Sequence, residues 1–354
     1  MIDDTALSKL RPLVEAELRA GNVPGAVIAV THDANQVAHL VIGSDADGQE
    51  LTADSIFPVA SVTKLATALA VLRLVEQNEL ELDDPLSYYV PTAEAAQPEV
   101  TIRSLLCHTS GLPAELANDA APYATGLDWP TLGHACIATP LEVPANTRVE
   151  YSNVGYGLLA LVVEHLTHQD FSAALESLVL QPLGIEAWLG VEPPRTPVRL
   201  ADTRGKHVGT ALEPFNSAFW RSLAFPWAGM LTTAAGALRL VCTFWHNHDG
   251  FLQPTTRAEA IRNQVGELRC TMFNKAVWDP CAWGLGPELR ATKTPHWAPP
   301  TAHPDSFGHA GASGCLVWAD PSAKVAWAML GARTAESGWL LRRGAAIGAA
   351  ILEH

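Results

Sequence analysis

The spacing of apolar residues near the N-terminus changes from a helical to a strand-like pattern. An amphipathic stretch predicts a helix that ends near Gly21. Two runs rich in β-forming residues follow at 25–31 and 36–42, and turn-forming residues separate them. The first part of the chain is therefore predicted to form a helix followed by a β-hairpin.

The middle of the chain has mostly helical spacing. Between Ser61 and Glu76 the apolar side chains recur every three or four residues, which predicts a helix with one buried face that begins at Ser61. Stretches rich in proline and glycine separate the later helical windows. These windows lie at 101–107, 154–167, 170–180, 233–245 and 255–268.

The last third returns to strand-like patterns and closes with a helix. Strands are predicted at 282–285, 314–319 and 324–330, and an amphipathic helix at about 336–352. Strands at the two ends of the chain must pair with one another, because the helical middle offers them no partners.

These elements predict an α/β fold of the α+β type. An antiparallel sheet built from the N- and C-terminal segments is flanked by the terminal helices and carries an inserted, mostly helical domain. We expect residues 1–60 and 270–354 to form the sheet domain and residues 61–269 the helical domain, with the active site in the cleft between them.

Composition narrows the class of protein. The chain has 354 residues, of which 48% are hydrophobic and 17% charged, so it can bury a large core. Its net charge is -14, and its basic residues form no long run. A surface that follows nucleic-acid phosphates is therefore not expected.

The cysteines and the N-terminus bear on the compartment. The six cysteines show no zinc-ribbon spacing, and we expect them to be buried thiols in a reducing compartment. The first residues lack the basic start and apolar block of a signal peptide, and the apolar runs are too short to cross a bilayer. We expect a soluble, cytoplasmic protein that contacts no membrane; the oligomeric state is left open.

Ser61-Val62-Thr63-Lys64 is the first candidate for chemistry. A serine at a helix N-terminus has a lysine three residues later, and hence on the same helical face. An amine with a lowered pKa could accept the serine proton, and the helix dipole would favour the developing negative charge. The alternative is a helix cap followed by a solvated lysine.

Two later segments add to this candidate. Glu150-Tyr151-Ser152-Asn153 places a phenol and an amide where an apolar helix begins. The stretch from Phe307 to Gly314 is rich in small residues, so a ligand could lie against its backbone N–H groups.

The order Ser-x-x-Lys, Tyr-Ser-Asn and His-x-Gly resembles the serine β-lactamase and penicillin-binding-protein superfamily, and its class C branch in particular. That branch includes family VIII carboxylesterases, D-stereospecific aminopeptidases and amidases, and several acyltransferases. The likeness extends from about residue 22 to residue 332. Three further stretches fit the superfamily: 105–112 (Leu-Leu-Cys-His-Thr-Ser-Gly-Leu), 228–233 and 314–321.

The resemblance implies a role for each matching residue. Ser61 would attack the carbonyl, Lys64 would help to deprotonate it, and Tyr151 would relay protons to the leaving group and from water. Asn153 would orient the substrate. The oxyanion would lie between the backbone N–H groups of Ser61 and Ala312.

The resemblance also assigns His309 and Gly311 to the substrate-binding wall. Relatives that act on β-lactams or cell-wall peptides usually have lysine where this chain has His309, and that lysine binds the substrate's carboxylate. A histidine favours esterases and amidases instead, because neutral imidazole carries no permanent charge.

Other candidate sites are weaker. The histidines at 165, 168, 246 and 248 lack an accompanying set of acidic or thiol ligands, so no metal is expected. Cys107 is interpreted as a packing residue. The chain has no Gly-x-Ser-x-Gly, P-loop or Gly-x-Gly-x-x-Gly motif, so neither an α/β-hydrolase nor a nucleotide cofactor is indicated. Four tryptophans could partly line an acyl pocket or belong to the core: Trp220, Trp227, Trp283 and Trp297.

The leading hypothesis is a serine hydrolase that forms an acyl-enzyme from a small ester or amide, with weak β-lactam hydrolysis as a side activity and no cofactor. The first alternative is a transacylase of a biosynthetic pathway that passes the same acyl group to an amine or alcohol. The second is a catalytically silent binding module. The sequence does not separate hydrolysis from transfer, and it does not identify the acyl donor.

Overall fold

The computed structural model describes residues 4–34, 36–93, 97–271 and 277–353. Its centre is a six-stranded sheet in the order β2-β1-β11-β10-β9-β8, in which every neighbouring pair is antiparallel. The strands are β1 (Gly25–His32), β2 (Gln36–Gly43), β8 (Glu288–Leu289), β9 (Phe307–Gly311), β10 (Cys315–Asp320) and β11 (Val325–Gly331).

Strands from opposite ends of the sequence lie side by side, as the strand patterns predicted. β1 pairs with β11 from Ala26 opposite Gly331 to His32 opposite Val325, and β1 forms the expected hairpin with β2. The mixed α/β architecture with an antiparallel sheet is therefore confirmed. The division at residues 60 and 270 stays a prediction.

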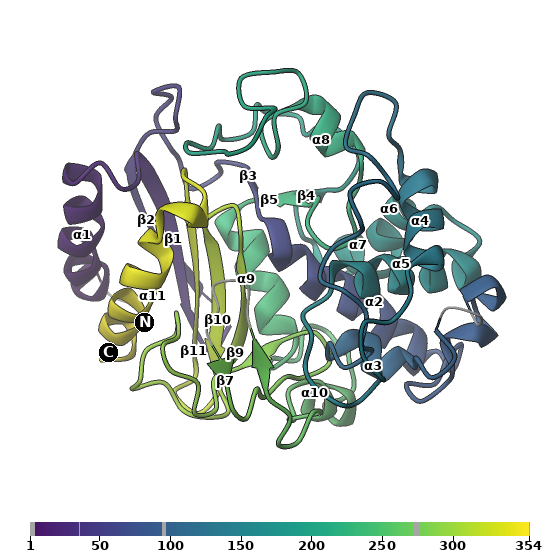
Figure 1. Ribbon diagram of the computed structural model, residues 1–354. Coiled ribbons are helices and arrows are strands. Elements are labelled where there is room, and N and C mark those ends of the chain that lie inside the picture. Colours follow the sequence, from purple (N-terminus) through teal and green to yellow (C-terminus); the bar gives the residue numbers. More distant parts are fainter. Residues whose placement is uncertain (1–3, 35, 94–96, 272–276, 354) are drawn as a thin grey trace.

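Both faces of the sheet are covered, and the alternation of side chains along β1 explains why. Ile28 and Val30 point into an outer core beneath α1 (Asp4–Arg19) and α11 (Trp339–Leu352), which pack against each other. Val27 and Ala29 point into the main core, where α9 (Ala234–Thr243) contacts the sheet. Successive side chains of a strand point to opposite faces, so an almost wholly apolar strand needs a layer on each side. Figure 1 shows the two terminal helices on one face and α9 on the other.

The remaining helices lie mostly on the far side of α9 (Figure 1). α2 (Thr63–Glu76) is central, and most of its side chains are buried. The others are α3 (Ile102–Leu106), α4 (Trp129–Ala138), α5 (Asn153–Thr167), α6 (Phe171–Leu175), α7 (Gln181–Leu183), α8 (Ala218–Ser222) and α10 (Pro254–Ala260). Two small sheets contain β3 (Phe57–Pro58), β4 (Ala187–Trp188) and β5 (Leu231–Thr232), and β6 (Cys270–Thr271) with β7 (Val277–Trp278).

Two predicted elements are wrong. Residues 282–285 form no strand: they make one isolated bridge, from Trp283 to Glu288, and the chain bends directly afterwards at Gly286, whose φ is 107°. Their apolar character reflects burial without sheet pairing: Trp283 lines a cavity, and Ala282 and Leu285 belong to the main core. The window 255–268 contains only the short helix α10, which stops at Ala260.

The cysteine prediction needs one correction. Cys270 and Cys281 form a disulfide, so two of the six are not free thiols. The two cysteines are 11 residues apart in the sequence, and the pairing of β6 with β7 brings them together. The other four are buried and free, as expected: Cys107, Cys136, Cys242 and Cys315. Within the described ranges, no helix is long and apolar enough to cross a membrane.

Candidate active site

Ser61 lies in a short 3-10 turn, Ala60–Val62, immediately before α2. Ala60 has a φ of 46°, a left-handed conformation that is unfavourable for a side chain with a Cβ. Thr63 fixes this turn, because its hydroxyl donates to the Ala60 carbonyl at 2.6 Å and accepts from the Met230 N–H at 3.1 Å. The strained turn therefore presents Ser61 at the wall of a cavity.

Lys64 is fully buried, and its side-chain nitrogen is surrounded by acceptors. Nζ lies 3.3 Å from Ser61 Oγ, 2.6 Å from Asn153 Oδ1 and 3.1 Å from the Trp227 carbonyl. Burial lowers the pKa of Lys64 well below its usual range, and the negative charge of Glu115 opposes that effect. A neutral amine here can donate to two of these acceptors and offer its lone pair to the proton of Ser61.

Tyr151 contacts both of these residues. A hydrogen bond joins it to Ser61, and Lys64 Nζ lies 4.6 Å from the centre of its ring. Burial raises the pKa of Tyr151, so the phenol keeps its proton at neutral pH. His108 packs on the ring at 4.5 Å and accepts a hydrogen bond from the Ser152 N–H at 3.1 Å. His108 thus holds the segment that carries Tyr151.

Asn153 is the first residue of α5, and its amide links two charged groups. Oδ1 accepts from Lys64, and Nδ2 donates to Glu115 Oε1 at 2.7 Å. Glu115 reaches the surface, yet desolvation of its carboxyl group raises its pKa, while Lys64 lowers it. A polar chain therefore runs from Glu115 through Asn153 and Lys64 to Ser61.

His309 lies on β9 and is a neutral imidazole. Its Nδ1 lies 2.8 Å from the Ala310 carbonyl, which can only accept, so Nδ1 carries the proton and Nε2 the lone pair. Burial and the nearby Lys64 lower the pKa of His309 to about 4. Nε2 is buried and has no partner among the described residues.

Gly311 and Ala312 bring the end of β9 against the serine turn. A Cβ on Gly311 would lie 2.3 Å from the Val59 carbonyl oxygen, so only glycine permits this approach. Within the described chain, the backbone N–H groups of Ser61 and Ala312 donate to no protein acceptor. These two donors are available to a developing oxyanion.

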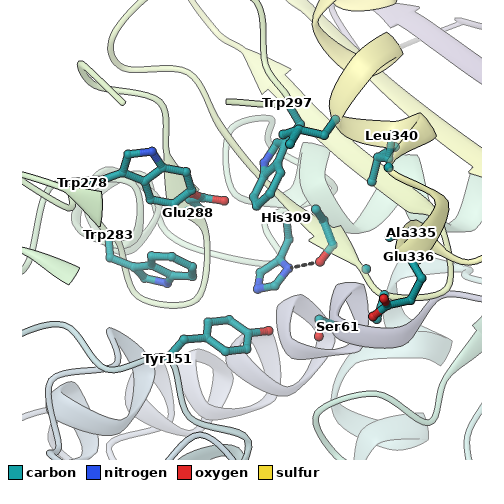
Figure 2. Close-up of a pocket in the computed structure, with 15 residues that line it drawn as sticks. Ser61, Tyr151, Trp278, Trp283, Glu288, Trp297, His309, Ala335, Glu336 and Leu340 are labelled. Atoms are coloured by element: carbon teal, nitrogen blue, oxygen red, sulfur yellow. Dashed lines mark hydrogen bonds between the residues drawn. The ribbon is translucent and has the colours of Figure 1, made fainter. Parts of the chain in front are cut away.

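A cavity of about 450 Å³ opens beside Ser61. Figure 2 shows Tyr151 and His309 between Ser61 and a wall formed by Trp278, Trp283 and Trp297. On the other side lie Ala335, Glu336, Leu340 and Leu341, next to and within the start of α11. Of the four tryptophans proposed from sequence, Trp283 and Trp297 line the cavity, whereas Trp220 and Trp227 belong to the main core.

The structure therefore brings all the sequence-predicted residues together. Ser61, Tyr151, His309, Gly311 and Ala312 line the cavity. Lys64 contacts Ser61 from the protein interior, and Asn153 contacts Lys64.

Sequence reasoning missed three residues that touch the site: Glu115, Trp278 and Glu288. None belongs to a recognisable short pattern, and only the fold brings them to the cavity. Across the described residues, no group of three or more histidine, cysteine, aspartate or glutamate side chains could hold a metal ion.

Comparison with known proteins identifies the family. A model of the Beta-lactamase family matches residues 10–349. Penicillin-binding protein 4 of Amycolatopsis lactamdurans is 31% identical, with 75% of this chain and 71% of that protein covered. Esterase EstB of Burkholderia gladioli is 32% identical, with 75% of this chain and 78% of that protein covered.

Solved structures agree with the sequence matches. A β-lactamase from Mycobacterium bovis superposes with a TM-score of 0.68 at 27% identity and covers 96% of this chain and 98% of its own. The D-amino acid amidase of Ochrobactrum anthropi shares the fold, with a TM-score of 0.76 at 21% identity over 99% of this chain and 98% of its own. The chain belongs to the Beta-lactamase family and is a serine hydrolase or acyltransferase of that family.

Proposed function

We propose that this protein hydrolyses small, uncharged esters or amides through an acyl-enzyme formed on Ser61. The observation that carries the proposal is the contact of the buried Lys64 amine with Ser61 Oγ at 3.3 Å, next to the phenol of Tyr151. A serine hydroxyl needs a base to become a nucleophile, and an amine of lowered pKa is such a base at neutral pH.

The reaction has two halves. Ser61 Oγ attacks the carbonyl carbon while Lys64 takes the hydroxyl proton, and the N–H groups of Ser61 and Ala312 stabilise the oxyanion. Lys64 returns this proton to Tyr151 while the Tyr151 phenol gives its own proton to the leaving group, and the acyl-enzyme forms. Water then attacks the carbonyl carbon of the acyl-enzyme and gives one proton to Tyr151, whose phenol proton passes to Lys64. Lys64 finally returns a proton to Ser61 Oγ as the acid product leaves.

The preference for an uncharged substrate rests on the wall of the cavity. His309 is neutral, and none of the described side chains that line the cavity is lysine or arginine. A substrate carboxylate would lose water here without gaining a cation, which is unfavourable. The similarity to Esterase EstB supports ester hydrolysis as the reaction.

Intact-mass spectrometry tests the proposal. A fluorophosphonate should add one adduct to the wild-type protein, and p-nitrophenyl esters should give an acyl-enzyme that decays in water. In Ser61→Ala the adduct should disappear and kcat should fall by at least about 10³-fold. Ser222→Ala, at an exposed serine outside the cavity, is the matched control.

The same experiment separates hydrolysis from transfer. Added amines or alcohols compete with water for the acyl-enzyme. A product that is mostly the free acid at millimolar acceptor supports hydrolysis, whereas a product that is mostly the amide or ester assigns the protein to acyl transfer. Unchanged labelling in Ser61→Ala would refute Ser61 as the nucleophile.

A further inference from the structure

Glu288 is a buried carboxylate that faces the substrate cavity. It lies on β8, is 1% exposed and lines the cavity wall. Lys293 Nζ binds its Oε1 at 2.8 Å, and His296 Nε2 binds the same oxygen at 3.2 Å. Within the described chain, no group donates to Oε2. One oxygen is thus anchored and the other is available.

The protonation state of this group follows from its contacts. His296 Nδ1 accepts a hydrogen bond from the Ala298 N–H at 3.0 Å, so the proton of the neutral ring is on Nε2 and points to Glu288. Burial alone would raise the pKa of Glu288, but Lys293 and His296 lower it to about 2. Glu288 is therefore ionised at neutral pH, and its available oxygen can only accept.

The indole rings beside Glu288 are held in place. Trp278 Nε1 donates to the Pro295 carbonyl at 3.1 Å, and Trp283 Nε1 donates to the Gly286 carbonyl at 3.2 Å. Lys293 Nζ lies 4.8 Å from the ring centre of Trp278 and 4.9 Å from that of Trp283. Hydrogen bonds and cation–π contacts thus fix two flat apolar walls before any substrate arrives.

These features point to one kind of substrate group. Fixed aromatic faces favour a planar apolar group, and an unpartnered carboxylate oxygen favours an N–H or O–H donor on it. The charge of Lys293 already offsets that of Glu288. An ammonium ion would therefore add net positive charge to a buried site, while a neutral donor would not.

Building on the proposed hydrolase function, we propose that Glu288 with Trp278, Trp283 and Trp297 forms a subsite for an aromatic substrate group that carries a neutral hydrogen-bond donor. Figure 2 shows these four side chains together at the end of the cavity away from Glu336. Glu288 acts here as a specificity-determining residue, and Lys293 as a positioning residue.

Matched ester pairs test the subsite in the wild-type protein. Each pair differs by one methyl group that removes the donor: p-nitrophenyl esters of indole-3-acetate and 1-methylindole-3-acetate, and of 3-(4-hydroxyphenyl)propanoate and its 4-methoxy analogue. In at least one pair, we expect kcat/KM to be about 10-fold or more higher for the ester that carries the donor than for its methylated partner. A preference below about fivefold in both pairs would overturn the subsite. The 4-aminomethyl analogue of the hydroxyphenyl ester carries an ammonium group. If its kcat/KM exceeds that of the hydroxyphenyl ester, the proposed preference for a neutral donor is wrong.

Two variants locate the effect. Glu288→Met combined with Lys293→Met replaces the buried ion pair by apolar side chains, a change that proteins often tolerate. The donor preference should fall to about onefold in this variant and persist in Trp245→Phe, whose tryptophan does not line the cavity. If the double variant does not fold, the kcat/KM ratios of the ester pairs in the wild-type protein still test the subsite. If the wild-type protein hydrolyses esters without a donor preference, only the subsite proposal is refuted. If fluorophosphonate does not label the wild-type protein, the proposed hydrolase function itself is refuted.

Discussion

Replacing His309 by lysine should convert the cavity from one that excludes carboxylates to one that binds them. With a pKa of about 4, His309 is charged in about 0.1% of molecules at pH 7, against about a quarter at an ordinary pKa of 6.5. A hydrogen bond to a charged group contributes about 1.5–3 kcal/mol. We therefore expect His309→Lys to raise the ratio of kcat/KM for an anionic substrate to kcat/KM for its neutral counterpart by about 10- to 100-fold.

The size of this gain depends on burial. Burial lowers the pKa of His309, and it would also lower the pKa of a new lysine at this position. The gain should consequently shrink as pH rises from 6 to 9. In the wild-type protein the ratio should stay level between pH 6 and 8, because the imidazole remains neutral throughout that range.

The assay compares a chromogenic cephalosporin that has a free carboxylate with its methyl ester. kcat/KM is measured for both in wild type, His309→Lys and His309→Gln, with circular dichroism melting as the control for folding. His309→Gln should retain most esterase activity, because the amide is neutral. A wild-type preference for the free acid that disappears in His309→Gln would refute the reasoning.

Three further predictions concern the catalytic group and its support. Tyr151→Phe should keep the fold and lower turnover by about 10²- to 10⁴-fold, since it removes a positioned proton relay; turnover within threefold of wild type would move that role elsewhere. Glu115→Gln should shift the acidic limb of the kcat/KM pH profile to lower pH, because the charge of Glu115 raises the pKa of Lys64, the group that must be neutral. A shift to higher pH would contradict this. Gly311→Ala should cost about 1–3 kcal/mol of stability, since its Cβ would lie 2.3 Å from a carbonyl oxygen. In a thermal melt, Gly133→Ala should cost much less, because its Cβ would meet only the flexible Leu161 side chain.

The parts of the fold that depend on local spacing could be predicted from sequence. Ser61 and Lys64 are three residues apart at a helix start, so their proximity follows from helical geometry alone. The β-rich runs at 25–31 and 324–330 predicted strands, and both form strands in the structure.

The rest of the site depends on tertiary structure. Glu115 meets Asn153 because the loop after α3 folds across the start of α5, and no pattern around residue 115 indicates this. Residues 282–285 have a strand-like composition, but they form a buried segment that bends at Gly286, whose φ is positive. A short apolar run does not distinguish a strand from a buried loop.

The pairing of β1 with β11 also constrains how the protein can be made on a ribosome. Partners in this pair, such as Ala26 and Gly331, are about 300 residues apart, which at about 5–20 residues per second takes about 15–60 s to synthesise. During that time β1 has only β2 beside it, and its other edge lacks a partner. Ser61 and Lys64 leave the ribosome early, but the N–H of Ala312 arrives late, so the nascent chain holds its nucleophile without a complete oxyanion site. Hydrolytic activity should therefore appear only after nearly the whole chain has been released.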